Sequence, residues 1–176
     1  LMKTLVFVID MLNGFVKFGA MADPSIAKIA PAVLKQIEAA KNVHFICDAH
    51  AERDLEMKRY PIHCLVGSPE AEVIEELAPY VSEQNVTFKR STNGFHNLDK
   101  KILGGFDRFV VTGCCTDICV MQFTLSLRTY LNEIGADKDV IVPRDAVATY
   151  DAPNHERGYY DECALSLMQN AGILVI

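Results

Sequence analysis

The amino-acid sequence predicts a three-layer, doubly wound α/β fold in which helices cover both faces of a six-stranded parallel sheet. Two observations lead to this fold class. Short apolar runs rich in β-branched residues alternate along the chain with segments of helical periodicity. The apolar runs are continuous rather than interleaved with polar residues, which is typical of strands buried on both faces. A length of 176 residues suits one domain, and no linker, internal repeat or low-complexity tract divides residues 1–176.

Six apolar runs are predicted as strands, and four periodic segments between them are predicted as helices. The strands are residues 3–10, 43–48, 86–89, 108–113, 140–143 and 173–176. The helices are residues 26–40, 70–80, 117–133 and 155–170. Ser68 and Pro69 supply a capping residue and a first-turn proline for the second helix, and Gly172 gives the fourth helix a stop signal.

The charge and composition argue against several kinds of partner. The formal net charge is −6 and the lysines and arginines form no stripe in the sequence, so we expect neither nucleic acid nor an anionic membrane surface. No apolar run approaches the roughly 20 residues that cross a bilayer. We expect no signal peptide because the strand pattern starts at residue 3. Six cysteines, mostly in apolar contexts, favour reduced thiols in a cytoplasmic protein.

Reactive side chains stand where the predicted strands end. Asp10 ends the first strand, Asp48 ends the second and Lys89 ends the third. The fourth strand runs into the turn 113–119, which ends at Cys119. The carboxyl ends of parallel strands share one edge of the sheet, where such folds bind ligands. A carboxylate, a lysine and a thiol should therefore converge there.

This trio suits nucleophilic catalysis by a thiol. Cys119 lies at the predicted start of a helix, where backbone N–H groups and the helix dipole favour a thiolate, and the Lys89 ammonium would lower its pKa further. Asp10 would accept the thiol proton and later return it to a leaving amine, while N–H groups of the turn would hold an oxyanion. Taken singly, a cysteine near a helix start is more often a small core residue. The coincidence of three reactive groups at one sheet edge favours a catalytic site.

Three segments, in order along the chain, resemble the isochorismatase-like cysteine hydrolases. They are FVIDMLNGF at 7–15, FKRSTNGF at 88–95 and VTGCCTDICV at 111–120. The resemblance implies the isochorismatase-like hydrolase fold and a Cys-Asp-Lys triad on Cys119, Asp10 and Lys89. It also implies an oxyanion hole formed by the N–H groups of Cys115 and Cys119, with a cis peptide bond between Cys114 and Cys115. By analogy with relatives, it implies a homo-oligomer.

A fourth segment separates the branches of this family. Residues 60–72, YPIHCLVGSPEAE, resemble the metal-site segment of nicotinamidases, which are also called pyrazinamidases. The resemblance implies one divalent ion, Zn²⁺ with Fe or Mn as alternatives, because one carboxylate and two imidazoles suit such an ion. The implied ligands are Asp48, His50 and His63, with Glu56 as a fourth and Asp54 as a second candidate for that place.

The same resemblance implies hydrolysis of a carboxamide. A metal-bound pyridine nitrogen would hold nicotinamide against Cys119, which would release ammonia and form a thioester that water converts to nicotinic acid. Phe15, Tyr60 and Ile118 would form walls for the ring, and Tyr60 replaces the tryptophan of many nicotinamidases. The product would feed pyridine nucleotide salvage and NAD biosynthesis.

Other functions stay open. An amidase of the same superfamily would act on another carbamoyl substrate, although members without pyridine substrates usually lack the two histidines. An isochorismate-cleaving vinyl-ether hydrolase would not need the cysteine nucleophile. From different classes, a redox sensor would use Cys114, Cys115 and Cys119, and a metal-stabilised scaffold would use the ligands alone. Ammonia release, compared with thiol titration after peroxide treatment, separates the enzyme from the sensor.

Overall fold

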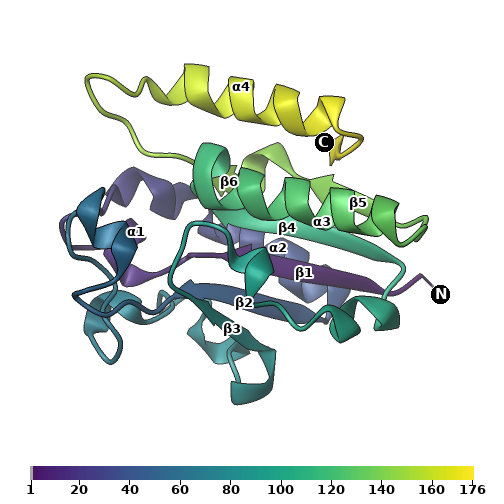
Figure 1. Cartoon of the computed structure of the whole chain (residues 1–176), viewed down its shortest axis with the longest axis horizontal. Coiled ribbons are helices and arrows are strands. Elements are labelled where there is room, and N and C mark those ends of the chain that lie inside the picture. The colour runs from purple at the N-terminus through teal and green to yellow at the C-terminus, as the bar shows by residue number, and fades with distance from the viewer. Residues whose placement is uncertain (1) are drawn as a thin grey trace.

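The structure is a computed structural model that describes residues 2–176, and it confirms the three-layer α/β fold (Figure 1). The strands follow the order β3-β2-β1-β4-β5-β7, and every pair in the sheet is parallel. Their bounds are β1 Thr4–Ile9, β2 Val43–Asp48, β3 Val86–Lys89, β4 Arg108–Cys114, β5 Asp139–Val142 and β7 Leu174–Val175. All six predicted strands are present. The two-residue strand β6, Val147–Ala148, pairs with the end of β4 and was not predicted.

Three of the four predicted helices are present, with changes at their starts. The α-helices are α1 Asn13–Val16, α2 Ala30–Ala40, α3 Met121–Glu133 and α4 Arg157–Asn170. The segment predicted as a helix over 26–40 begins as a 3-10 helix, Pro24–Ile29, before α2. The segment predicted over 117–133 begins as a π-helical turn, Thr116–Val120, before α3. The carboxylate of Glu156 caps α4 by accepting the N–H groups of Gly158 and Tyr159.

The prediction of a helix over 70–80 is wrong. This segment holds only the short 3-10 turns Pro69–Ala71 and Ala78–Tyr80. Its backbone bonds elsewhere instead, since the Ile74 N–H donates to Met11 O at 3.0 Å and Glu72 O accepts the N–H of Asn13 at 2.9 Å. The segment after β1 therefore forms hydrogen bonds with backbone N–H and C=O groups of residues 70–80 that a helix would have paired internally.

β1 lies near the centre of the sheet and divides the core in two. Its residues Leu5, Phe7 and Ile9 belong to a buried cluster with α3 and α4. Val6 and Val8 belong to a second buried cluster, on the other face, with α2. Both faces of the strand are therefore covered, and this double burial accounts for its unbroken apolar run.

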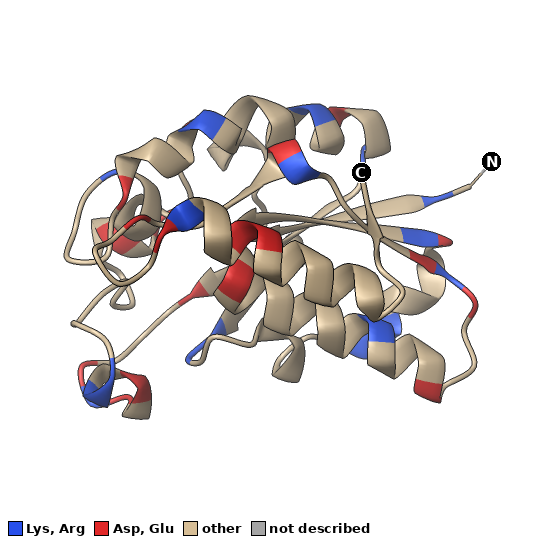
Figure 2. Cartoon of the chain, turned by 90° about the horizontal axis from the view of Figure 1, so that it is seen from above, with Lys and Arg blue, Asp and Glu red and all other residues tan. Residues whose placement is uncertain are grey.

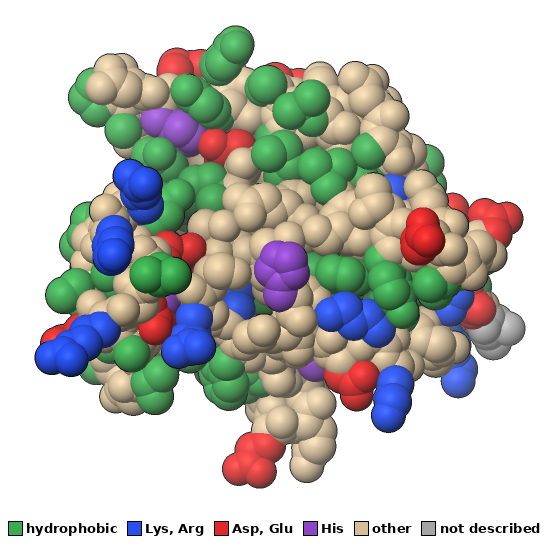
Figure 3. Space-filling model, in the orientation of Figure 1, with side chains coloured by type: hydrophobic (Ala, Val, Ile, Leu, Met, Phe, Trp, Pro, Cys, Tyr) green, Lys and Arg blue, Asp and Glu red, His purple; other side chains and the backbone are tan. Residues whose placement is uncertain are grey.

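The surface carries charges of both signs. Figure 2 shows acidic and basic residues side by side on the same helices and loops. Figure 3 shows basic side chains toward both ends of the visible face, with acidic and hydrophobic ones among them. Within residues 2–176, every helix is too short or too polar to cross a bilayer.

Candidate active site

The predicted catalytic residues meet at the carboxyl ends of adjacent strands. Asp10 directly follows β1, and Lys89 is the last residue of β3. Cys119 lies in the π-helical turn that follows β4. These side chains are buried, with exposed fractions of 1%, 2% and 8% for Asp10, Lys89 and Cys119. Asp48, at the end of β2, completes the row because β3, β2, β1 and β4 are neighbours in the sheet.

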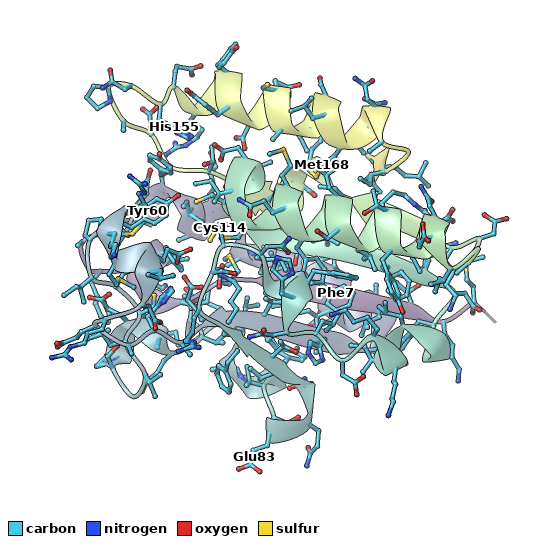
Figure 4. All side chains as sticks on the ribbon, viewed as in Figure 1. Phe7, Tyr60, Glu83, Cys114, His155 and Met168 are labelled. Atoms are coloured by element: carbon cyan, nitrogen blue, oxygen red, sulfur yellow. The ribbon has the colours of Figure 1, made fainter. Side chains whose placement is uncertain are left out.

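A cavity of about 480 Å³ opens at this edge of the sheet. All of the predicted site residues line it except Lys89 and His50, which are buried beside it, and Asp54, the second candidate for the fourth ligand. In Figure 4, Tyr60 and Cys114 lie at this end of the molecule, and both belong to the cavity wall. The structure therefore brings the triad, the metal-ligand candidates and the pocket candidates to one place.

Local backbone geometry directs Cys119 into this cavity. Gly113 has a φ of +109°, and a Cβ there would lie 2.0 Å from the carbonyl oxygen of Ile9, so only glycine fits between β4 and β1. Just after Gly113, the peptide bond between Cys114 and Cys115 is cis, as the family resemblance implies. The chain then enters the π-helical turn, a feature that often marks functional sites. The role of the Cys115 and Cys119 N–H groups as oxyanion donors stays a prediction.

Lys89 joins the carboxylates to the thiol. Its Nζ lies 2.8 Å from Asp10 Oδ2 and donates a hydrogen bond to Asp48 and a longer one, at 3.8 Å, to Cys119 Sγ. Asp10 has a φ of +49°, and its Oδ1 accepts the N–H of Asp48 at 3.0 Å. Close packing holds the lysine in place, because a Cβ on Gly94 would lie 2.2 Å from Ile46 and 3.1 Å from the Lys89 side chain.

The burial of this cluster sets its protonation states. Burial, followed by the Asp48 carboxylate, raises the pKa of Asp10 to about 6, against the opposing effect of Lys89. Burial opposes charge on Lys89 as well, but Asp10, Cys119 and Asp48 raise its pKa well above the usual range. Burial raises the pKa of Cys119, and the Lys89 ammonium only partly offsets it. Burial therefore opposes the thiolate that the helix start and Lys89 are expected to favour, which agrees with the expected need for a base such as Asp10.

Four side chains form a cluster that fits a divalent ion. One ligand atom from each of Asp48, His50, Glu56 and His63 lies within 4.8 Å of all the others. His50 Nε2 is 3.0 Å from Glu56 Oε2 and 3.4 Å from Asp48 Oδ2, and His63 Nε2 is also 3.4 Å from Asp48 Oδ2. The Nε2 atom of His50 is buried and, despite these short distances, makes no hydrogen bond of acceptable geometry within residues 2–176. Two imidazoles and two carboxylates at this spacing are the donors that Zn²⁺ binds.

Partners outside the cluster orient both imidazoles. His50 Nδ1 lies 3.1 Å from Asp54 Oδ2, and His63 Nδ1 lies 2.7 Å from the carbonyl oxygen of Pro61. These contacts leave each Nε2 directed at the other ligands. Asp54 was the second candidate for the fourth ligand. The structure places it behind His50 instead, outside the four-residue cluster.

The segment carrying His63 is fixed to the end of β2. His50 donates its N–H to the carbonyl oxygen of Cys64 at 3.0 Å and accepts the N–H of Val66 at 2.9 Å, which forms a single β-bridge. Cys64 has a φ of +45°, and the carboxylate of Glu70 accepts its N–H at 3.1 Å. This bridge holds the two imidazole rings with their centroids 4.7 Å apart.

Aromatic and apolar side chains form much of the remaining cavity wall. Phe15 and Tyr60 lie against His63, with ring centroids 5.5 and 6.4 Å away, and Ile118 adjoins Cys119. Sequence reasoning missed the loop 20–24 and Tyr150, which also line the cavity. Neither carries a motif, and tertiary packing alone brings them to the site.

The fold and site define a doubly wound α/β protein with a thiol, a carboxylate and an ammonium beside a candidate metal centre. The sequence profile of the isochorismatase domain family matches residues 4–161, so the chain belongs to that family. Nicotinamidase 1 of Arabidopsis thaliana is 29% identical over 175 residues, covering 84% of this chain and 70% of the relative.

Solved structures share the fold over nearly the whole chain. A pyrazinamidase of Pyrococcus horikoshii in complex with zinc has a TM-score of 0.77 and 25% identity, covering 99% of this chain and 98% of that one. An N-carbamoylsarcosine amidase of Thermoplasma acidophilum has a TM-score of 0.76 and 28% identity, covering 99% and 95%.

Proposed function

We propose that this protein is an isochorismatase-family amidohydrolase that hydrolyses nicotinamide to nicotinic acid and ammonia. The observation that carries the proposal is the position of the Asp48, His50, Glu56 and His63 cluster in the same cavity as Cys119. A thiol alone serves many substrates, whereas a metal centre beside it suits a substrate with a ligating ring nitrogen. The similarity to a nicotinamidase and to a zinc-bound pyrazinamidase supports this choice.

The triad supplies the proton transfers. A pKa of about 6 leaves the Asp10 carboxylate ionised near neutral pH, so it accepts the proton of Cys119 as the sulfur attacks the carboxamide carbon. Lys89, 2.8 Å from Asp10 and 3.8 Å from the sulfur, stabilises the thiolate that forms. N–H groups of Cys115 and Cys119 hold the oxyanion. Asp10 then protonates the departing ammonia, and the C–N bond breaks to leave a thioester.

Hydrolysis of the thioester completes the cycle. Asp10, again ionised, accepts a proton from the attacking water. The carbon–sulfur bond then breaks, and the departing Cys119 thiolate takes that proton back from Asp10, which regenerates the thiol and the carboxylate. Asp48, His50, Glu56 and His63 would hold a divalent ion, which would supply a Lewis acid for the ring nitrogen of the substrate. Phe15 and Tyr60 supply flat surfaces for the ring beside it.

The charge of the cavity favours a neutral carboxamide. Among residues 2–176, no lysine or arginine lines the cavity, whereas five carboxylates do: Asp10, Asp23, Asp48, Glu56 and Asp151. Arg59, which adjoins the wall residue Tyr60, is exposed outside it. A substrate that carries its own carboxylate would find no lysine or arginine on this wall. This argues against an N-carbamoyl amino acid, which the similarity to an N-carbamoylsarcosine amidase otherwise keeps as the second candidate.

Ammonia release tests the proposal. The wild-type protein is assayed with nicotinamide, pyrazinamide and N-carbamoylsarcosine, before and after chelation and again after zinc is restored. We expect release from the two ring amides, its loss on chelation and its recovery with zinc. Cys119→Ala should bind zinc but release no ammonia. Ammonia release from N-carbamoylsarcosine alone would favour the second candidate function over nicotinamide hydrolysis. Release from none of the three compounds would mean that the protein is not an amidase for these substrates.

A further inference from the structure

A stack of three rings stands beside the cavity and has no part in the triad or the metal cluster. The ring of His155 lies between those of Tyr150, 3.9 Å away at an interplanar angle of 6°, and Tyr160, 4.0 Å away at 16°. In Figure 4, His155 lies below the start of α4, near Tyr60. Tyr150 lines the cavity, so the ring at one end of the stack forms part of the cavity wall.

His155 connects this stack to the turn that bears the nucleophile. Its Nε2 lies 2.7 Å from Asp117 Oδ2, and its Nδ1 lies 3.0 Å from the carbonyl oxygen of Tyr150. The other oxygen of Asp117 accepts the hydroxyl of Thr149 at 2.6 Å. Asp117 is two residues before Cys119 in the same π-helical turn. Both ring nitrogens of His155 therefore have a partner. Nδ1 contacts the backbone of Tyr150 in the cavity wall, and Nε2 contacts Asp117 in the turn that carries Cys119.

A second set of contacts fixes the backbone around Tyr150. Arg157 donates through Nε to the carbonyl oxygen of Thr149 at 2.8 Å and through Nη2 to Asp23 at 2.5 Å. Asp23 also accepts the N–H of Asp151 at 3.0 Å. These bonds fix the segment on both sides of Tyr150 and tie it to the loop that contains Asp23, another part of the cavity wall.

We propose that Tyr150 is a substrate-binding wall for a planar ring and that His155 is a positioning residue that couples this wall to the Cys119 turn. The inference rests on the proposed function in one respect, that the cavity holds the ring of the substrate. Tyr150 provides a flat face without charge, which suits an uncharged heteroaromatic ring. His155 touches no reacting atom. It acts by holding Tyr150 through its ring face and Asp117 through Nε2.

Substitutions at His155 separate these two connections. His155→Phe keeps a flat ring in the stack but cannot bond to Asp117. His155→Gln keeps a side-chain donor but removes the stacked ring. Tyr150→Leu removes the wall, and Tyr150→Phe retains it. His96→Ala is the matched control, because His96 is exposed and lies outside the stack.

Two measurements on the zinc-loaded protein need no amide turnover. The first is the rate at which iodoacetamide alkylates Cys119, followed by mass spectrometry. The second is the protection of Cys119 by 3-methylpyridine, a ring that cannot be hydrolysed, which gives its Kd. The kcat and KM for nicotinamide are measured in parallel. If the wild-type protein hydrolyses no amide, the proposed function fails while these two readouts still judge the present inference.

The expected results differ between the two residues. Tyr150→Leu should raise both the Kd of 3-methylpyridine and the KM about tenfold, and Tyr150→Phe, which keeps the flat ring, should raise them less. His96→Ala should stay within about twofold of wild type. His155→Phe should lower kcat and the alkylation rate about tenfold with little change in Kd, and His155→Gln should chiefly weaken binding.

Two outcomes would overturn the inference. One is unchanged binding of 3-methylpyridine by Tyr150→Leu. The other is an unchanged alkylation rate in His155→Phe. A purely structural role would instead lower the unfolding temperature of each His155 variant and leave both readouts at their wild-type values. If His155→Phe fails to fold, His155→Gln decides alone, and wild-type binding by that variant counts against the inference.

Discussion

The ammonium of Lys89 lies 2.8 Å from the carboxylate of Asp10, and both side chains are at least 98% buried. Lys89 also donates to Asp48, so one cation neutralises two buried carboxylates. Removing it leaves both charges without their counter-ion inside the fold. We predict that Lys89→Met lowers the free energy of unfolding by about 3–5 kcal/mol and abolishes amide hydrolysis. Urea denaturation and the ammonia assay measure the two effects.

The control for this change is an ion pair on the surface. Lys17 lies 2.5 Å from Glu76, but the two side chains are 31% and 39% exposed. Lys17→Met should therefore cost less than about 1 kcal/mol and leave kcat unchanged. Equal destabilisation by the two substitutions would show that the buried pair has no special energetic role. Wild-type turnover in Lys89→Met would remove Lys89 from the mechanism.

Gly113 provides a second test because it permits the close approach of two strands. It combines a φ of +109° with a position where a Cβ would meet the backbone of Ile9 at 2.0 Å. Backbone cannot move aside as a flexible side chain can. Gly113→Ala should therefore destabilise the fold by about 3 kcal/mol, from the unfavourable φ and the clash together.

Gly104→Ala is the matched control for this substitution. Nothing lies within 4 Å of a Cβ at Gly104, and its φ is outside the left-handed region. It should change the unfolding free energy by less than about 0.5 kcal/mol. Thermal and urea unfolding compare the two variants. A Gly113→Ala protein as stable as Gly104→Ala would mean that β1 and β4 separate at little cost.

The strands, and the meeting of the predicted catalytic residues at one sheet edge, could be predicted from sequence because their signals are local. An unbroken apolar run marks a strand buried on both faces, so β1 and β2 were placed to within a residue or so. Parallel topology then sends the residue at each strand end to one edge, which brings Asp10 and Lys89 together. The prediction of the triad therefore required no knowledge of how the loops fold.

The remaining features depend on contacts between distant segments. Ser68 and Pro69 carry the local signals of a helix start, yet the backbone at Ile74 bonds to Met11, 63 residues earlier in the chain, and the helix does not form. Asp117 and His155 meet across 38 residues, and neither segment predicts the other. Local patterns do not reveal such pairings, because the partners are chosen by the packing of the whole chain.

His44 gives the fold a dependence on pH that is separate from the active site. Its Nε2 lies 2.7 Å from Thr87 Oγ1, and burial lowers the pKa of the ring from 6.5 to about 4. The unfolded chain therefore takes up this proton before the folded protein does. The stability contributed by neutral His44 is complete above pH 6.5 and is lost as the pH falls toward 4.

We predict that His44→Gln reduces this dependence. Glutamine can still bond to Thr87 but has no titrating group. Between pH 7 and pH 4 the wild-type protein should lose about 2–3 kcal/mol more unfolding free energy than the variant. Urea denaturation over that range measures both curves, and the carboxylates that titrate in both proteins cancel in the difference. Parallel curves would show that His44 is protonated equally in the folded and unfolded states.

Asp54 contacts a metal-ligand candidate, His50, without belonging to the four-residue cluster. Its Oδ2 lies 3.1 Å from His50 Nδ1 and also accepts the N–H of Ala51 at 3.0 Å. Asp54→Asn should keep one bound zinc per chain but weaken its affinity about 10–100-fold, since the amide holds the imidazole less firmly. Competition against a chromophoric chelator measures the affinity.

Two further variants test whether Asp54 orients His50 or binds the metal itself. Glu56→Gln removes a member of the cluster and should weaken zinc binding more than Asp54→Asn does, because a ligand is lost rather than a partner of a ligand. Glu52→Gln, exposed on the same loop, should bind zinc as the wild type does. If Asp54→Asn matched Glu52→Gln, the contact to His50 would have no effect on the metal centre. If it weakened binding more than Glu56→Gln, Asp54 would be the fourth ligand and Glu56 the outer residue.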